Sequence, residues 1–181
     1  GVPKVIRMPK QTMLASASMT NHFFGLSSES TALLCLPASY IAGKMMIVRA
    51  IIGGYTLTAV APSANPFSHL TEKIDFSAIT PYQLVQSATS LQNADIGKII
   101  VGGSPVTPAM EKMSASWKVA LYETFGMTET ASHIALRRFN GSGYSPYFQV
   151  LPGVKISQDE RNCLIIKAPH LTEELLVTND I

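Results

Sequence analysis

The sequence predicts an α/β fold in which a mostly parallel sheet with flanking helices is followed by a β-rich, more antiparallel C-terminal third. Short apolar runs alternate with helical segments up to residue 125, an order typical of a parallel sheet. From Gly126 onward the apolar runs are short and separated by Gly, Pro and Asn, which favours antiparallel strands. With 181 residues and 46% hydrophobic content, the chain is long enough to bury one core. We therefore expect two parts, residues 1–125 and 126–181.

Each expected element rests on a local signal. Lys10 to about Asn21 carries apolar residues at helical spacing, and Ile41 to Ile52 is a mostly apolar helix closed by two glycines. A proline in its first turn favours a helix over 81–91. The rest of the first part is expected as a short strand ended by Pro37, strands at 56–60, 75–80, 98–103 and 117–123, and a helix at 108–116. The second part is expected to form strands at 134–139, 147–151, 154–157, 163–168 and 174–178.

Composition and charge exclude several classes of partner. The formal net charge is +2 and the longest basic run is the pair Arg137-Arg138, too little for a nucleic-acid surface. No apolar stretch reaches the ~18 residues of a membrane span, since Lys44 and Arg49 interrupt the best candidate. The two cysteines stand in apolar runs without metal or redox spacing, which suits a reducing cytoplasm. We expect a cytoplasmic protein without nucleic-acid or membrane partners.

The segment YETFGMTETA carries the most chemical information. A strand ending near Tyr122 runs into a glycine at Gly126, and in open α/β sheets ligands bind at this carboxyl edge. Thr128 can donate to a phosphate oxygen, and Glu129 offers the hard oxygen ligand that Mg²⁺ prefers. The alternative is a helix cap, with both residues stabilising only a first turn. This segment alone leaves both interpretations open.

Two further segments have weaker signals. Gly103, Ser104 and Pro105 follow a strand directly, where missing side chains let the backbone approach a flat ligand. Lys4 stands in GVPK, which is similar to the tail of a phosphate-binding loop. Taken by itself, Lys4 could equally be a solvated surface lysine.

Together and in this order, these segments resemble the adenylate-forming acyl-CoA synthetase family, also called the AMP-binding family. The matching motifs are Gly-x-Pro-Lys at residues 1–4, Leu36-Pro37 followed by Gly43, Gly103-Ser104-Pro105, the aromatic-Gly-x-Thr-Glu signature at Phe125 to Glu129, and Thr178-Asn179-Asp180 in place of Thr-Gly-Asp. The resemblance covers essentially the whole chain.

The resemblance implies ATP-dependent activation of a carboxylic acid to an acyl-adenylate and then a coenzyme A thioester, with ATP, Mg²⁺ and coenzyme A as cofactors. It implies these roles: Lys4 at the pyrophosphate side, Thr128 on phosphate, Glu129 on Mg²⁺, Gly103, Ser104, Pro105, Phe125 and Gly126 around the nucleotide base, and Asp180 on the ribose. It also implies that the mobile C-terminal domain and the first half of the phosphate loop lie outside this chain. We therefore expect an internal fragment of the large N-terminal domain that is poorly active alone.

Three positions depart from the family's pattern. Asn179 replaces the usual glycine, Tyr40 stands where many members have His, and Glu123 lies where Asn is common. Tyr40 is expected to line the acyl pocket, so its identity bears on the shape of that pocket more than on nucleotide chemistry.

Arg49 suggests which acid is bound. It sits in the apolar helix IAGKMMIVRAIIGG, where an unpaired charge is costly to bury. It could clamp a substrate carboxylate in a bidentate pair, or extend to the surface or pair with an internal acid. The o-succinylbenzoate:CoA ligases of menaquinone synthesis look similar here, with a carboxylate-binding arginine at this offset from the Leu-Pro segment. The resemblance therefore implies o-succinylbenzoate as the acid.

Other functions stay open at this point. The chain could belong to a fatty-acid, aryl-acid or amino-acid adenylating enzyme, or to a nucleotide-binding module without catalysis. A dehydrogenase-type dinucleotide domain is disfavoured, because no G-x-G-x-x-G opens a helix after a strand. The four histidines show no metal-ligand spacing and are expected as surface or capping residues. A homo-oligomer is also left open.

Overall fold

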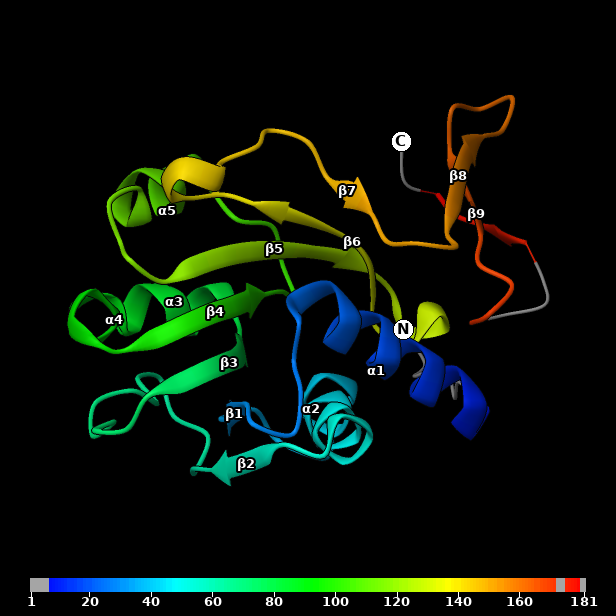
Figure 1. Cartoon of the computed structure of the whole chain (residues 1–181). Helices are drawn as coiled ribbons and strands as arrows, with labels where there is room; N and C mark the ends of the chain where they lie inside the picture. Colours follow the sequence, from blue (N-terminus) through cyan, green and yellow to red (C-terminus); the bar gives the residue numbers. More distant parts are fainter. Residues whose placement is uncertain (1–6, 172–174, 180–181) are drawn as a thin grey trace.

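The computed structural model describes residues 7–171 and 175–179 and contains a seven-stranded sheet and a three-stranded sheet (Figure 1). The helices are α1 (Lys10–Phe24), α2 (Ile41–Gly53), α3 (Pro81–Gln86), α4 (Ala88–Asn93) and α5 (Pro108–Ser114), with short 3-10 helices η1 (Thr128–Thr130) and η2 (Gly141–Gly143). The strands are β1 (Thr31–Leu34), β2 (Thr56–Ala59), β3 (Ile74–Ile79), β4 (Ile96–Val101), β5 (Ala120–Gly126), β6 (His133–Arg138), β7 (Gln149–Val150), β8 (Lys155–Gln158), β9 (Leu164–Lys167) and β10 (Leu176–Val177).

The large sheet changes direction along its width. Its strand order is β2-β1-β3-β4-β5-β6-β7, and the pairs from β2 to β5 are parallel whereas β5–β6 and β6–β7 are antiparallel. The small sheet, β10-β9-β8, is entirely antiparallel. The predicted fold class, a mostly parallel sheet with flanking helices followed by antiparallel strands, is therefore confirmed.

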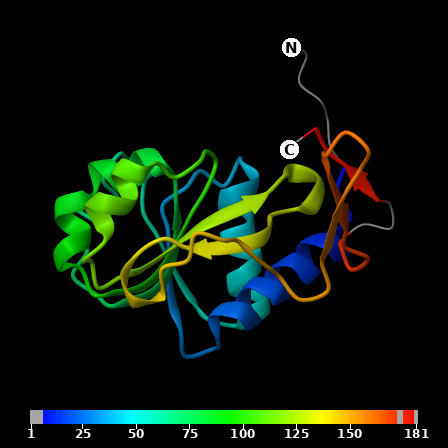
Figure 2. The same ribbon diagram turned by 90° about the horizontal axis from the view of Figure 1, so that it is seen from above.

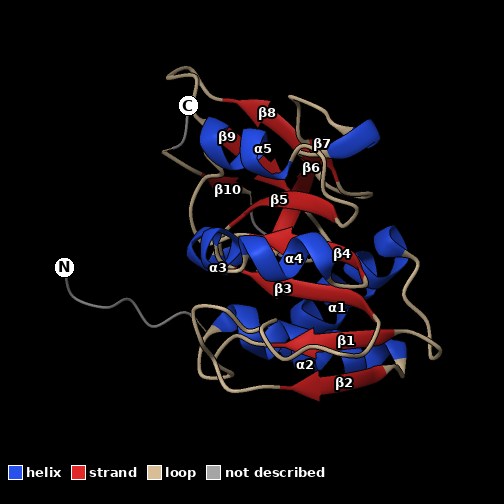
Figure 3. Ribbon diagram, turned by 90° about the vertical axis from the view of Figure 1, so that its left-hand side faces the viewer, coloured by secondary structure: helices blue, strands red, loops and turns tan. Residues whose placement is uncertain are grey.

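Helices cover both faces of the parallel strands. In Figure 3, α3, α4 and α5 lie in front of the sheet and α1 and α2 lie behind it. Side chains of β4 alternate between the two resulting cores, since Ile99 and Val101 pack with the α3–α5 side and Ile100 packs with the α1–α2 side. Strands buried on both faces read as continuous apolar runs. This explains the run KIIV in the sequence.

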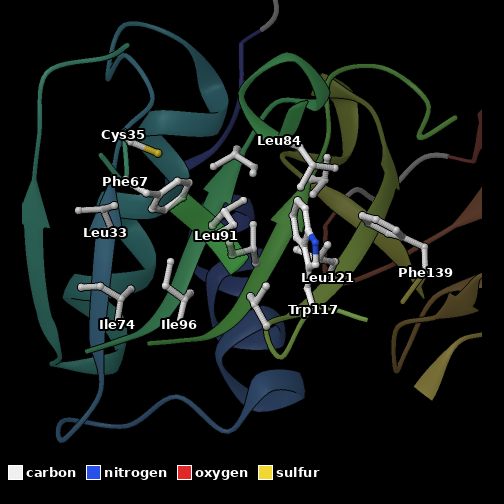
Figure 4. Close-up of a cluster of buried hydrophobic side chains, with 14 of the residues drawn as sticks. Leu33, Cys35, Phe67, Ile74, Leu84, Leu91, Ile96, Trp117, Leu121 and Phe139 are labelled. Carbon is white, nitrogen blue, oxygen red and sulfur yellow. The ribbon is translucent and has the colours of Figure 1, made fainter. Parts of the chain in front are cut away.

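The core on the α3–α5 side is the larger cluster and is shown in Figure 4. Leu84 and Leu91 of the helices meet Leu33 and Leu121 of the strands, and Trp117 closes the cluster beside them. A third cluster joins β6 to the small sheet, and α1 contributes partly buried side chains to it. Helix α1 therefore packs against the large sheet and also against the residues around the small one.

Two expected elements differ from the structure. The helix expected over 81–91 is two helices, because Ser87 has non-helical dihedrals (φ −96°, ψ 7°) between α3 and α4. A capping box of Thr80 and Gln83 starts α3 as its proline suggests. Strand β5 begins at Ala120 and not at Trp117, which is buried in the core. No helix within the described part of the chain is long and apolar enough to cross a membrane.

Candidate functional site

The turn after β5 is held in one shape by backbone and side-chain bonds. The Thr130 hydroxyl accepts from the Met127 N–H (3.1 Å) and lies 2.7 Å from the Ser132 carbonyl. Ala131 adopts φ +63°, a conformation that costs energy for a residue with a side chain. A Cβ at Gly126 would lie 2.4 Å from the Ser132 carbonyl oxygen, so only glycine lets β6 return this closely. The motif therefore forms a tight, strained turn at the carboxyl edge of the sheet.

Thr128 and Glu129 lie on this turn. They belong to η1, a single 3-10 turn that leads directly into β6, so no α-helix follows for them to cap. Thr128 is exposed and Glu129 is half-buried. Among the described residues no three His, Cys, Asp or Glu side chains gather as a metal site. Glu129 is thus a single carboxylate on an accessible edge, which suits Mg²⁺ because this ion keeps waters and phosphate oxygens as its other ligands.

The glycine turn after β4 lies beside the motif turn. Strands β4 and β5 are parallel neighbours, with Val101 opposite Glu123. A Cβ at Gly102 would lie 2.2 Å from the Thr124 hydroxyl, so the turn lies against β5. Gly103 has φ +94° and is exposed, as are Ser104 and Pro105. The structure therefore brings the two segments that the sequence assigns to the nucleotide to adjacent strand ends.

Glu123 anchors the end of that glycine turn. Its carboxylate accepts from the Val106 N–H (2.8 Å) and from Arg137 Nε (3.0 Å), and Arg137 also lies 2.8 Å from Glu111 of α5. Burial opposes the charge of Arg137, but the hydrogen bonds that Arg137 donates to the two carboxylates outweigh it and raise the pKa of Arg137. The position that departs from the family's pattern is thus part of an ion cluster, Glu111–Arg137–Glu123, in which Glu123 and Arg137 are buried and Glu111 is half-buried.

Phe125 connects the motif to the edge of the sheet. Its ring packs edge-on against Phe148, with centroids 6.0 Å apart. The Arg137 guanidinium carbon lies 5.7 Å from the centroid of the same Phe148 ring, a cation–π distance. The aromatic residue that the sequence places near adenine is therefore packed next to the ion cluster.

Arg49 is the most buried charged side chain of the site. It is 1% exposed, and its Nη2 donates to Ser132 Oγ at 2.6 Å. Nη1 lies 3.8 Å from Met46 Sδ, and Nε has no hydrogen-bond partner in the part of the chain that the structure describes. Burial lowers the pKa of Arg49 to about 10, with Tyr55 opposing this shift. The side chain does not extend to the surface, so that alternative is wrong. No acid within residues 7–171 and 175–179 forms an ion pair with it.

The sequence analysis predicted no role for His133 beyond a surface or capping position. It is 4% exposed at the start of β6, with Nδ1 3.2 Å from Ser132 Oγ and Nε2 3.2 Å from Thr20 Oγ1. Burial, and then the charge of Arg49, lower its pKa well below its ordinary value. The expectation of a surface or capping histidine is wrong here, because β6 pairs back along β5 and carries this side chain into the interior. The only sequence signal was its place directly after the TETAS segment.

Other predicted site residues lie apart from this group. Tyr40 is 70% exposed at the start of α2 and, at 1.5 Å per residue, roughly 13 Å along the helix axis from Arg49. Lys4 and Asp180 lie outside the described residues. Asn179, which precedes Asp180, accepts from Arg161 Nη1 at 3.5 Å.

The Leu-Pro segment and its glycine are explained by packing. A Cβ at Gly43 would lie 2.3 Å from the Pro37 carbonyl oxygen, so α2 can approach the end of the β1 loop only with glycine there. A groove of about 720 Å³ lies elsewhere, lined by Leu33 and by residues between 58 and 72. None of the predicted site residues lines it, so it is not the candidate site.

Comparison with known proteins agrees with this arrangement. The family described as AMP-binding enzyme matches residues 1–162. A 2-succinylbenzoate–CoA ligase of Staphylococcus epidermidis is 28% identical over 137 residues, which cover 73% of this chain and 29% of that protein. One from Staphylococcus aureus is 28% identical over 138 residues, covering 73% and 28%.

Solved structures of acyl-CoA synthetases share the fold of this chain. An acyl-CoA synthetase (AMP-forming)/AMP-acid ligase II-like protein from Dyadobacter fermentans has a TM-score of 0.91 and 39% identity, covering 99% of this chain and 53% of that one. The o-succinylbenzoate CoA synthetase of Bacillus subtilis, in complex with ATP and magnesium, has a TM-score of 0.82 at 18% identity, covering 97% and 40%. At that identity the likeness concerns the fold alone. The chain spans less than a third of the curated relatives and about half or less of these structures.

Proposed function

Because the chain belongs to the AMP-binding enzyme family, we propose that it contributes the nucleotide and acid sites of an adenylate-forming acid–thiol ligase. A substrate carboxylate attacks the α-phosphate of ATP and pyrophosphate leaves. The thiol of coenzyme A then attacks the acyl-adenylate and AMP leaves. Both partners of the first step are anions, so the site must supply positive charge and hydrogen-bond donors where negative charge develops.

The residues at the carboxyl edge of the sheet suit this demand. Thr128 is exposed and can donate to a phosphate oxygen, and Glu129 would hold Mg²⁺. Bound Mg²⁺ would neutralise phosphate charge during the displacement. Gly103 to Pro105 present backbone without bulky side chains, and Phe125 offers a ring for the base. By the family's pattern Lys4 and Asp180 would act at pyrophosphate and ribose.

We propose a dicarboxylic acid, o-succinylbenzoate, as the substrate, and the observation that carries this is Arg49. A buried guanidinium without a carboxylate partner among the described residues, and with Nε unpaired, is completed by an anionic ligand. The relatives named 2-succinylbenzoate–CoA ligase support the choice of acid. Met46 lies against Nη1, and the guanidinium of Arg49 is buried away from solvent. Binding of the acid therefore requires the flexible Met46 side chain to move aside.

The test is pyrophosphate release by the full-length protein with MgATP and o-succinylbenzoate, a fatty acid, an aryl acid or no acid. We expect pyrophosphate release with o-succinylbenzoate and with none of the other acids. Release with another acid would keep the ligase class and remove this substrate, and release with none would favour a nucleotide-binding module. We also propose that the enzyme acts in the cytoplasm, as its cysteine usage predicts.

Arg49 is tested separately. Arg49→Ala should raise KM for the acid by about 10-fold or more, because a charge-assisted pair is worth about 1.5–3 kcal/mol. KM for ATP should stay unchanged. The control is Lys73→Ala, an exposed basic side chain paired with Asp75, which should change neither constant. An unchanged KM for the acid in Arg49→Ala would remove the clamp.

A further inference from the structure

We infer that Thr20, Ser132 and His133 are positioning residues that form a hydrogen-bonded chain of fixed direction and hold the Arg49 guanidinium in place for the acid. This inference rests on the proposed role of Arg49. The chain joins three elements that are distant in sequence, α1, α2 and the start of β6. In Figures 1 and 2 the turn that leads into β6 lies beside α1.

The direction of the chain follows from the number of protons available. Arginine has donors only, so Ser132 Oγ must accept from Nη2. The Ser16 carbonyl can only accept, so the Thr20 proton goes there and Thr20 Oγ1 must accept from His133 Nε2. The neutral ring then has a bare Nδ1, which accepts the Ser132 proton. A neutral imidazole with bare Nδ1 carries its proton on Nε2 and donates it to Thr20 Oγ1. Thr20 passes its own proton to the Ser16 carbonyl at 3.1 Å.

Every hydroxyl of the chain is thus used once as donor and once as acceptor. The reverse order would turn the Thr20 proton toward His133 Nε2 and break its bond to the Ser16 carbonyl. Since Thr20 is fully buried and His133 nearly so, a broken link would leave an unpaired polar group away from water. A hydrogen-bond network in such surroundings fixes orientation more firmly than one in water.

Helix α1 also holds the other end of Arg49. The side-chain amide of Asn21, next to Thr20, donates to the Arg49 carbonyl at 2.8 Å. The backbone and the guanidinium of Arg49 are therefore both tied to neighbouring residues of α1. This contact explains how a long, flexible side chain keeps one orientation, with Nε and the remaining N–H groups left for a carboxylate.

A neutral His133 is essential to this arrangement. A protonated imidazole would donate from Nδ1 to Ser132 and would add a second positive charge next to Arg49. Ser132 would then receive two donors, and its own proton would have no place in the chain. Burial and the charge of Arg49 both favour the neutral ring.

The experiment measures KM for o-succinylbenzoate, KM for ATP and kcat in the full-length protein, with unfolding midpoints for each variant. Ser132→Ala should raise KM for the acid about 10-fold and leave KM for ATP unchanged. Thr20→Val should act in the same direction, and Thr20→Ser, which keeps the hydroxyl, should restore the wild-type value. The matched control is Thr12→Val, since Thr12 is another buried threonine of α1 and its hydroxyl donates to the Leu171 carbonyl, away from Arg49.

Two substitutions of His133 separate its two nitrogens. His133→Asn keeps an acceptor near the position of Nδ1 but loses the Nε2 donor to Thr20, so it should raise KM for the acid as Thr20→Val does. His133→Gln carries its amide near the position of Nε2, loses the Ser132 link and should behave like Ser132→Ala. A wild-type KM for the acid in His133→Gln would show that the link from Ser132 to His133 does not position Arg49 and would overturn the inference.

A double variant separates this inference from the role of Arg49 itself. If Arg49→Ala raises KM for the acid, Ser132→Ala should add nothing in that background, because both act through one guanidinium. Additive effects, or effects matched by Thr12→Val, would show that the chain is only structural and would overturn the inference. If Arg49→Ala leaves KM for the acid unchanged, Arg49 does not bind the acid, and the positioning role of Thr20, Ser132 and His133 is then also wrong.

Discussion

Removal of the Glu123 carboxylate tests how the glycine turn is held. Glu123→Ala deletes three hydrogen bonds, one from the Val106 N–H and two from Arg137. The side chains of Glu123 and Arg137 are 9% and 10% exposed, so the remaining groups are not solvated in compensation. Arg137 keeps only Glu111, and the Val106 N–H loses its partner.

The expected cost follows from this burial. Breaking a buried ion pair by removing one partner costs about 3–5 kcal/mol. The unpaired Val106 N–H belongs to the same network and is not added to that figure. For a domain of this size the midpoint of thermal unfolding should fall by roughly 6–20 °C. KM for ATP should also rise, because the turn at Gly103 to Pro105 loses its anchor.

The assay is equilibrium unfolding together with steady-state kinetics. Glu123→Gln keeps an acceptor for Val106 and should lose clearly less stability than Glu123→Ala. Arg161→Ala, which breaks an exposed ion pair, should leave the midpoint unchanged. A loss below about 1 kcal/mol in Glu123→Ala would refute the reasoning from burial. A large loss with KM for ATP unchanged would refute the link to the nucleotide.

Three further predictions concern the same region. Because the pKa of His133 is lowered in the folded protein, its contribution to the free energy of unfolding is fully present above the unfolded pKa of about 6.5 and falls by up to about 1.4 kcal/mol per pH unit below it. His133→Asn should lose this part of the pH dependence of the free energy of unfolding. Equal pH dependence in the variant and the wild type would contradict the assignment. Gly126→Ala should cost about 1–3 kcal/mol and abolish most pyrophosphate release, because its Cβ meets the Ser132 carbonyl; wild-type rates would contradict this. Gly43→Ala should lower the unfolding midpoint, because the new Cβ would lie 2.3 Å from the Pro37 carbonyl oxygen. This clash opposes the gain of about 1 kcal/mol that alanine gives over glycine inside a helix. A raised midpoint would show that the loop at Pro37 moves to make room.

Local patterns in the sequence were sufficient for much of the fold. The alternation of apolar runs and helical segments predicted the parallel strands up to β5. The short apolar runs separated by Gly, Pro and Asn after Gly126 predicted the antiparallel strands. Proline in the first turn of α3 marked a true helix start. The break at Ser87 was missed, because neither glycine nor proline marks it and both halves favour helix.

Local motifs also located the edge of the site, whereas its interior required the tertiary structure. Glycine turns and the segment FGMTE report backbone geometry a few residues long, so the sequence itself determines where they bend. The partners of Arg49 and His133 are instead 83 and 113 residues away along the chain, at Ser132 and Thr20. Periodicity carries no information about such pairs, because strand order and helix packing decide which side chains meet. The family and the carboxyl-edge turns could therefore be inferred from the sequence alone, but only the packing of α1, α2 and β6 shows what holds the buried arginine.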